Sequence, residues 1–203
     1  VPQNLCAKIP DNVCDETAAF SVIGAIALQG IRLANPTFGE TVVVIGLGLV
    51  GLMAIQLLKA NGCKVIGLDT DKDKVELAKK FGVISNQIFD NVDPLDWCLN
   101  QNAGNAIDIS IITASTKSST PIDLAARLSR KRGKIILVGV SGMDLKRDIF
   151  YKKEIIFQVS CSYGPGRYDS IYENFNEYPV GFVRWTAKRN FEAILNAFSN
   201  LQI

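Results

Sequence analysis

The chain has 203 residues, 48% hydrophobic and 21% charged, a balance typical of folded globular proteins with a buried core rather than of disordered chains. Its formal net charge of +2 gives no reason to expect a nucleic-acid partner. The chain contains no histidine, which excludes Ser–His–Asp and Cys–His catalytic arrangements and histidine-containing zinc sites within it.

The cysteines are scattered without a C-x-x-C pair. Their positions are Cys6, Cys14, Cys63, Cys98 and Cys161. An odd number at irregular spacing argues against a disulfide framework and favours a reducing, cytoplasmic location. The thiols do not cluster either, so we expect no metal site in this chain. There is no signal peptide and no apolar run long enough to cross a membrane, so no membrane association is expected.

The chain opens with a proline-containing stretch, residues 1–14, that is typical of a linker. The apolar segment Glu16–Leu33 then predicts a helix, either continuous or broken near Gly24. Asn12 or Asp15 is the candidate N-terminal cap of this helix.

A strand, a helix and a second strand are expected after the turn at Asn35–Glu40. Val42–Ile45 is a β-branched apolar run, long enough for a strand that is buried on both faces. The helix is expected over Leu49–Asn61 and the second strand over Lys64–Leu68.

A G-x-G-x-x-G motif, made by Gly46, Gly48 and Gly51, lies where the first strand meets the helix. The first glycine permits a tight turn, the second lets the backbone approach a pyrophosphate, and the third lets the helix pack close to the strand. The helix would point its first amides and the positive end of its dipole at the phosphates. Asp69 follows about 20 residues later, where a carboxylate accepts hydrogen bonds from ribose hydroxyls. The combination predicts a dinucleotide-binding turn.

The rest of the chain alternates between helical and strand patterns. The helices are expected at Asp71–Phe81 (capped by Thr70 or Asp71), Pro94–Ala103, Pro121–Arg132 and Trp185–Leu201. The strands are expected at Gln87–Phe89, Ala106–Thr113, Lys134–Val140 and Glu154–Ser162. Such alternation predicts an α/β fold with a doubly wound, mostly parallel sheet, a Rossmann fold, as a single domain over residues 15–203.

Residues 39–82 closely resemble the coenzyme domain of medium-chain, zinc-type alcohol dehydrogenases, in GETVVVIGLGLVGLMAIQLLKANGCKVIGLDTDKDKVELAKKFG. The lead-in through IPDNVCDETAAFSVIGAIALQGIRLANPTFGE and the strand GKIILVGV are similar to the same family. A narrower resemblance, to bi-domain oxidoreductases, lies in ITASTKSSTPIDLAARLSRKRGKIILVG, KKEIIFQVSCSYGPGRYD and YPVGFVRWTAKRN. The resemblance implies that residues 1–14 link to a missing catalytic domain, which would hold the substrate and most zinc ligands.

The motif and the resemblance together imply the cofactor-binding residues. These are Gly46, Leu47, Gly48, Leu49, Val50, Gly51, Asp69, Thr70, Lys74, Thr113, Ala114, Val138, Gly139 and Val140. The carboxylate of Asp69 would repel a 2′-phosphate, so NAD is expected rather than NADP. Lys74 matches a lysine that reaches the adenosine ribose, and an exposed first-turn lysine is an equal alternative. The backbone at Thr113–Ala114 and Val138–Val140 would face the nucleosides and the nicotinamide. No residue of this chain is assigned to catalysis.

Three further features follow the fifth expected strand. In the resembled family the strand that matches residues 155–161 pairs with its twin, so a homodimer through this strand is expected. Arg167, in the glycine-rich turn 162–169, is expected to pair with Asp169 or a partner chain, or else to contact a phosphate. The aromatic residues beyond it are expected to pack an insertion or an interface. They are Tyr168, Tyr172, Tyr178, Phe182 and Trp185.

The expected function is the NAD(H)-binding domain of a dehydrogenase that moves a hydride between nicotinamide and an alcohol or sugar-like substrate. The isolated chain is expected to bind the cofactor without turnover. The alternative is a regulatory module that senses NAD(H) without catalysis. A methyltransferase is a more distant alternative, because those enzymes also use a glycine loop and an acid after the second strand.

Overall fold

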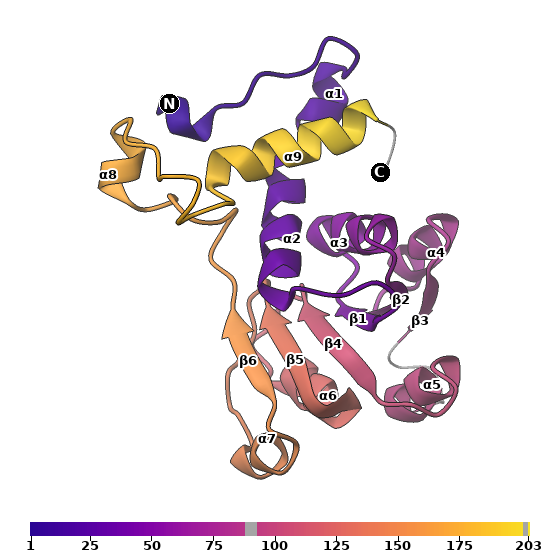
Figure 1. Cartoon of the computed structure of the whole chain (residues 1–203). Helices are drawn as coiled ribbons and strands as arrows, with labels where there is room; N and C mark the ends of the chain where they lie inside the picture. The colour runs from indigo at the N-terminus through magenta and orange to yellow at the C-terminus, as the bar shows by residue number, and fades with distance from the viewer. Residues whose placement is uncertain (88–92, 201–202) are drawn as a thin grey trace.

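The computed structural model describes residues 1–87, 93–200 and 203 of the chain. Its strands form one parallel six-stranded sheet in the order β3-β2-β1-β4-β5-β6 (Figure 1). The strands are β1 Thr41–Ile45, β2 Lys64–Asp69, β3 Ile84–Gln87, β4 Ile107–Ile112, β5 Ser129–Leu137 and β6 Ile156–Val159. The helices are α1 Asp15–Ala18, α2 Ser21–Ala34, α3 Leu49–Ala60, α4 Lys72–Lys80, α5 Pro94–Gln101, α6 Thr120–Leu128, α7 Arg147–Lys153, α8 Ser170–Glu173 and α9 Ala187–Ser199.

The strand order reverses beside β1, which has β2 on one side and β4 on the other. In register, Ile45 lies opposite Leu68 on one neighbour and Ile112 on the other. The carboxyl ends of β1, β2 and β4 therefore meet at one edge, which is the topological switch point where open α/β sheets bind ligands. The predicted doubly wound parallel sheet is confirmed.

The sheet has an apolar core on each face, and alternate residues of β1 belong to different cores. Val42 and Val44 pack with α2, α3 and α9, whereas Val43 and Ile45 pack with α5 and α6. All residues of β1 are buried. The prediction of a strand buried on both faces is confirmed, and the β-branched side chains suit that setting.

The first helix is broken earlier than predicted. α1 ends at Ala18 and α2 begins at Ser21, so the break lies at Ala19–Phe20 and not near Gly24. Gly24 lies inside α2, where an added Cβ would be 2.8 Å from a methyl group of Ile194 on α9. A helix interior tolerates this glycine because two helices cross closely there. The cap prediction is also wrong, because Cys14 occupies the cap position of α1 without a side-chain hydrogen bond.

Within the described residues one helical stretch, Asp15–Ala34, is long and apolar enough to cross a membrane, whereas the sequence analysis expected none. It covers 20 residues with a mean hydropathy of 1.5, and 44% of its window is buried in the fold. α2 packs against α3 and α9 (Figure 1). Packing against α3 and α9 accounts for the buried part of its apolar surface, because core helices have the same character.

The predicted helix Pro121–Arg132 is too long at its end. α6 stops at Leu128 and the chain enters β5 at once. Arg130 is held there by Asp108, with 2.6 Å between Nε and Oδ1, and Arg132 adopts a left-handed backbone with φ of 58°. The basic run therefore forms an irregular strand start, where the pairing of β4 with β5 shifts register.

The short elements α7 and α8 were not predicted. α7 buries no residue and α8 has only 4, so neither has a clear hydrophobic period. The third strand begins earlier than predicted, at Ile84, and Phe89 lies outside the described residues. Leu201, the expected end of the last helix, also lies outside them.

The segment between β6 and α9 packs around buried Tyr172. Its hydroxyl donates to the carbonyl oxygen of Asn4, and the Asn4 side-chain amide donates back to the Tyr172 carbonyl. Arg167 pairs with Glu173 at 2.6 Å, so the expected pairing with Asp169 is wrong. Asp169 instead caps α8 and accepts a hydrogen bond from the hydroxyl of Tyr178.

Candidate functional site

The glycine-rich turn lies at the carboxyl end of β1. Gly46 has φ of +102°, and an added Cβ would be 2.5 Å from the backbone nitrogen of Ala114. At Gly51 an added Cβ would collide with the carbonyl oxygen of Gly46 and approach Thr113 Oγ1 to 2.9 Å. The fold itself therefore requires the first and third glycines, as the motif predicts.

Gly48 has a different setting, because no heavy atom lies within 4 Å of an added Cβ. Its φ of −69° suits any residue, so neither packing nor backbone strain requires a glycine here. Gly48 is the cap residue of α3, where the first amides of a helix lack acceptors within the helix. Because Gly48 has no side chain and no atom lies in front of it, a pyrophosphate could approach the backbone closely at this helix N-terminus.

Asp69 ties the end of β2 to this turn. It is buried, with Oδ2 accepting from the Leu47 amide at 2.5 Å and Oδ1 accepting from the Asp71 amide at 2.9 Å. Each carboxylate oxygen has a second lone pair that remains for a ribose hydroxyl. The carboxylate thus lies at the predicted place and also organises the turn.

The first turn of α4 continues from Asp69. Asp71 caps the helix by accepting from the Asp73 amide, a contact that holds the pKa of the Asp71 carboxyl below its usual range. Lys74 pairs with Asp71 at 3.4 Å and is about half exposed. Thr70 lies exposed between Asp69 and Asp71. Lys74 is thus an exposed first-turn lysine, and its predicted contact with the adenosine ribose stays a prediction.

The ends of β4 and β5 form the other side of the site. Thr113 Oγ1 donates to the carbonyl oxygen of Gly46 at 2.5 Å, and the amide of Ala114 donates to the carbonyl oxygen of Ile45 at 3.0 Å. At Gly139 an added Cβ would be 2.7 Å from the carbonyl carbon of Thr113. The ends of β1, β4 and β5 thus lie in close backbone contact. The sequence analysis did not predict the hydrogen bond from the Thr113 hydroxyl to the glycine turn.

The predicted cofactor-binding residues differ in the exposure and direction of their side chains. Leu47 is fully buried against the core, and its amide is already bonded to Asp69. Val138 turns its side chain toward α2, where it would meet a Cβ added at Gly30. Leu49 and Val140 are exposed at 60% and 71%. The side chains of Leu47 and Val138 therefore face the core, and the expected backbone contacts of Val138–Val140 with the nicotinamide stay a prediction.

Groups for acid–base or metal chemistry are sparse in the part of the chain that the structure describes. No three Asp, Glu, Cys or His side chains gather there in a way that would hold a metal ion. The cysteines are free: Cys63 and Cys98 are buried, and the other three are exposed.

The comparisons with known proteins assign the family. Residues 50–178, more than half of the chain, match the family model described as zinc-binding dehydrogenase, and the chain belongs to that family. D-xylulose reductase A of Aspergillus oryzae is 28% identical over 177 residues, which are 83% of this chain and 48% of that protein. An alcohol dehydrogenase of Geobacillus stearothermophilus is 30% identical over 146 residues, which are 70% of this chain and 42% of that protein.

Solved structures agree on the fold. The alcohol dehydrogenase rspB of E. coli CFT073, complexed with NADH, superposes with a TM-score of 0.78 at 24% identity, over 100% of this chain and 53% of its own. The alcohol dehydrogenase TADH of Thermus sp. ATN1 superposes with a TM-score of 0.76 at 20% identity, over 97% and 51%. This chain spans about half the length of the relatives it matches.

Proposed function

We propose that this chain is the NAD(H)-binding domain of an oxidoreductase that transfers a hydride between nicotinamide and an alcohol or sugar-like substrate. Two observations at the same turn carry the proposal together. Gly48 is a glycine although packing does not require one, and the Asp69 carboxylate is hydrogen-bonded to the turn. The family membership and the relatives named as dehydrogenases and reductases support the reaction class.

The turn would hold the pyrophosphate through the first amides of α3, aided by the positive end of the helix dipole. Asp69 would accept from the adenosine ribose hydroxyls and disfavour a 2′-phosphate, which is why NAD(H) is proposed over NADP(H). The backbone at Thr113–Ala114 and Val138–Val140 would orient the nicotinamide half across the switch point. The nicotinamide supplies the hydride chemistry when it is bound, and the chain supplies position and electrostatics.

Substrate binding is proposed to need a further domain. The chain covers 48% of the matched reductase and 42% of the matched alcohol dehydrogenase. Any zinc and the proton relay are proposed to lie in that domain as well. In isolation the chain would therefore bind NAD(H) and show no alcohol-dependent turnover.

A sensing module is the second candidate, because the described residues gather no acid–base or metal cluster around the glycine turn. The two candidates share the cofactor site and differ in the whole protein. Reduction of NAD by a panel of alcohols and polyols, assayed with the full-length protein, separates them: turnover supports the dehydrogenase, and cofactor binding without any turnover supports the sensor.

A homodimer through β6 is also proposed. Among the residues that the structure describes, β6 has one sheet neighbour, β5, and its Ile156 and Val159 are 51% and 53% exposed. An edge with unpaired backbone groups and apolar side chains is suited to pairing with a second copy. For location we propose the cytoplasm, on the ground that the cysteines are free.

The proposal is tested by titrating NADH and NADPH into the chain, with nicotinamide fluorescence and calorimetry as readouts. We expect saturable binding of NADH and binding of NADPH that is at least about tenfold weaker, because the extra phosphate meets the Asp69 carboxylate. Far-UV circular dichroism establishes that the sample is folded. Absence of binding of either cofactor to the folded chain contradicts the proposal.

A further inference from the structure

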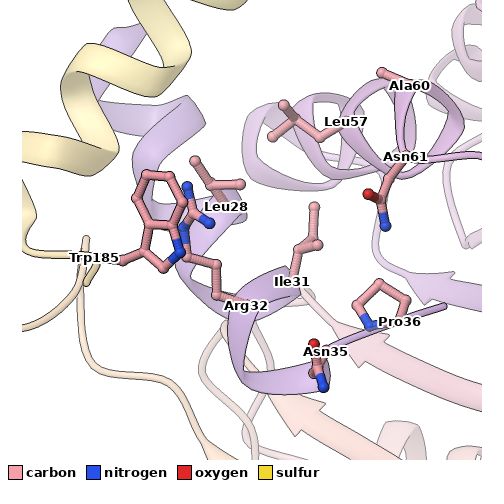
Figure 2. Close-up of a pocket in the computed structure, with 9 residues that line it drawn as sticks. All are labelled: Leu28, Ile31, Arg32, Asn35, Pro36, Leu57, Ala60, Asn61 and Trp185. Carbon is pink, nitrogen blue, oxygen red and sulfur yellow. The ribbon is translucent and has the colours of Figure 1, made fainter. Parts of the chain in front are cut away.

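A pocket of about 430 Å³ lies between the last turns of α2 and α3 (Figure 2). Leu28 and Ile31 of α2 face Leu57 of α3 across it, and Pro36 adds to the floor. Trp185, from the loop before α9, lies beside Arg32 at one end. The volume is in the range of small-molecule sites. The lining combines apolar side chains with the polar side chains of Arg32, Asn35 and Asn61, and its exposed surface is about equally polar and apolar.

This pocket is separate from the cofactor site. α3 has 12 residues, and its first turn lies at the glycine motif whereas its last turn lines the pocket. At 1.5 Å per residue the two ends of the helix are about 18 Å apart. A nucleotide on the glycine turn therefore leaves the pocket free.

Two arginines stack on the Trp185 ring. The guanidinium carbon of Arg32 is 3.4 Å from the ring centroid, and that of Arg184 is 3.9 Å from it. Arg32 Nε donates to Asn190 Oδ1 at 2.8 Å. Within the described residues neither guanidinium has a carboxylate partner, whereas Arg127, Arg130, Arg132, Arg167 and Arg189 each form an ion pair.

The two positive charges repel each other, and Arg32 is partly buried whereas Arg184 is exposed. Burial, with a smaller contribution from the charge of Arg184, lowers the pKa of Arg32 to about 10. The C-terminal ends of α2 and α3 carry partial negative charge of about half an electron each, which offsets only part of two full positive charges. The stacking on Trp185 explains where the guanidinium groups lie, and it leaves their positive charge uncompensated.

We propose that this pocket binds a small organic oxyanion, a carboxylate or phosphate ester carried on an apolar body. The anionic group would bond to the terminal nitrogens of Arg32, in the planar geometry that guanidinium shares with carboxylate and phosphate. The apolar body would lie against Leu28, Ile31 and Leu57. Arg184 would add long-range attraction from behind the tryptophan ring.

The test uses fluorine NMR of the chain labelled with 5-fluorotryptophan. The chain has two tryptophans, Trp97 and Trp185, so one resonance reports on the pocket and the other is an internal control, with Trp97→Phe giving the assignment. The probes are phenylacetate, its neutral isostere phenylacetamide, phenyl phosphate and inorganic phosphate. Saturating NADH is present throughout, so that the probes do not occupy the cofactor site.

We expect phenylacetate or phenyl phosphate to shift the Trp185 resonance saturably and leave that of Trp97 in place; the stronger of the two identifies the anionic group. Phenylacetamide and inorganic phosphate should bind at least about tenfold more weakly, because phenylacetamide lacks the negative charge and inorganic phosphate lacks the apolar body. Arg32→Gln and Arg184→Gln should weaken binding, and Arg32→Lys should restore part of it. Arg147→Gln is the matched control, because Arg147 also stacks on an aromatic ring, that of Tyr151.

Three results overturn the proposal. No shift of Trp185 by any probe shows that the pocket binds no such ligand. Equal binding of phenylacetate and phenylacetamide shows an apolar hollow without anion recognition, and this comparison needs no variant to fold. Equal losses in Arg184→Gln and Arg147→Gln show that general surface charge, not this pocket, attracts the probe.

Discussion

The carboxylate of Asp69 accepts a hydrogen bond from the backbone amide of Leu47, with 2.5 Å between the two atoms. The acid at the end of β2 therefore fixes the conformation of the glycine turn at the end of β1. Asp69 shapes the proposed pyrophosphate site and would also face the adenosine ribose. Its replacement should therefore change both the stability of the chain and its preference for NADH over NADPH.

Asp69→Asn is expected to reduce the preference for NADH over NADPH by about tenfold, because the negative charge facing a 2′-phosphate is removed. The chain should also lose about 1–3 kcal/mol of unfolding free energy, since the new amide places a donor against the Leu47 or Asp71 amide. Calorimetric titrations give the ratio of the two affinities, which does not depend on the stability change while the protein stays folded.

Asp73→Asn is the control for this experiment. Asp73 lies exposed in the first turn of α4 and carries the same charge. The ratio should stay within about twofold of the original protein, because the charge there is screened by water. Equal changes in the two variants would show that net charge, and not the position of Asp69, selects the cofactor.

Gly51→Ala is expected to destabilise the fold by about 2 kcal/mol or more, because the added methyl group meets the carbonyl oxygen of Gly46 and the hydroxyl of Thr113. Alanine would otherwise favour a helix, so a loss of stability isolates the close approach of α3 to β1. Urea denaturation measures the change. Unchanged or increased stability would show that α3 does not lie as close to the turn as described.

The dimer proposal predicts that the chain self-associates at micromolar concentrations and that Ile156→Lys prevents it, since a charged side chain on the edge strand opposes pairing. Sedimentation velocity over a range of concentrations gives the oligomeric state. Ile171→Lys is the matched control, because Ile171 is 66% exposed on α8. A monomer at every concentration, or equal effects of both changes, would contradict pairing through β6.

Cys98 is expected to resist alkylation in the folded chain at a pH of about 8, because burial raises its pKa from 9.0 to about 12 and keeps it as the unreactive thiol. The exposed Cys6, Cys14 and Cys161 should react with iodoacetamide first. Peptide mass spectrometry measures each rate, and labelling in denaturant shows that Cys98 is intrinsically reactive. Rapid labelling of Cys98 in the native chain would contradict its burial on the inner face of α5.

The glycine turn and the central strands could be predicted because their signals are local. Val42–Ile45 is an unbroken β-branched run, and three glycines at fixed spacing define the turn that follows it. Asp69 was predicted as a ribose ligand from its distance along the chain, its place after the second expected strand and the family resemblance. Its hydrogen bond to the Leu47 amide was not predicted, because the register of β1 against β2 is a property of the folded sheet.

The errors occurred where distant partners override a local pattern. Arg130 and its basic neighbours continue the helical pattern of Pro121–Leu128, yet Asp108, 22 residues earlier, draws Arg130 into the start of β5. The pocket at Arg32 and Trp185 could not be predicted, because their residues come from segments more than 150 positions apart. Aromatic residues in the 168–185 segment were noted, but Asn4, the hydrogen-bond partner of Tyr172, lies near the start of the chain.

The most direct test of the central claim is a calorimetric titration of NADH into the original chain, Gly48→Ala and Gly181→Ala. Neither glycine has a heavy atom within 4 Å of an added Cβ, and neither has a positive φ, so both variants should fold, with at most about 1 kcal/mol lost at the Gly48 cap position. The account predicts that Gly48→Ala weakens NADH binding by about tenfold or more, because the methyl group occupies the approach of the pyrophosphate, and that Gly181→Ala leaves it unchanged. Equal NADH affinity in all three proteins would contradict a pyrophosphate at this turn.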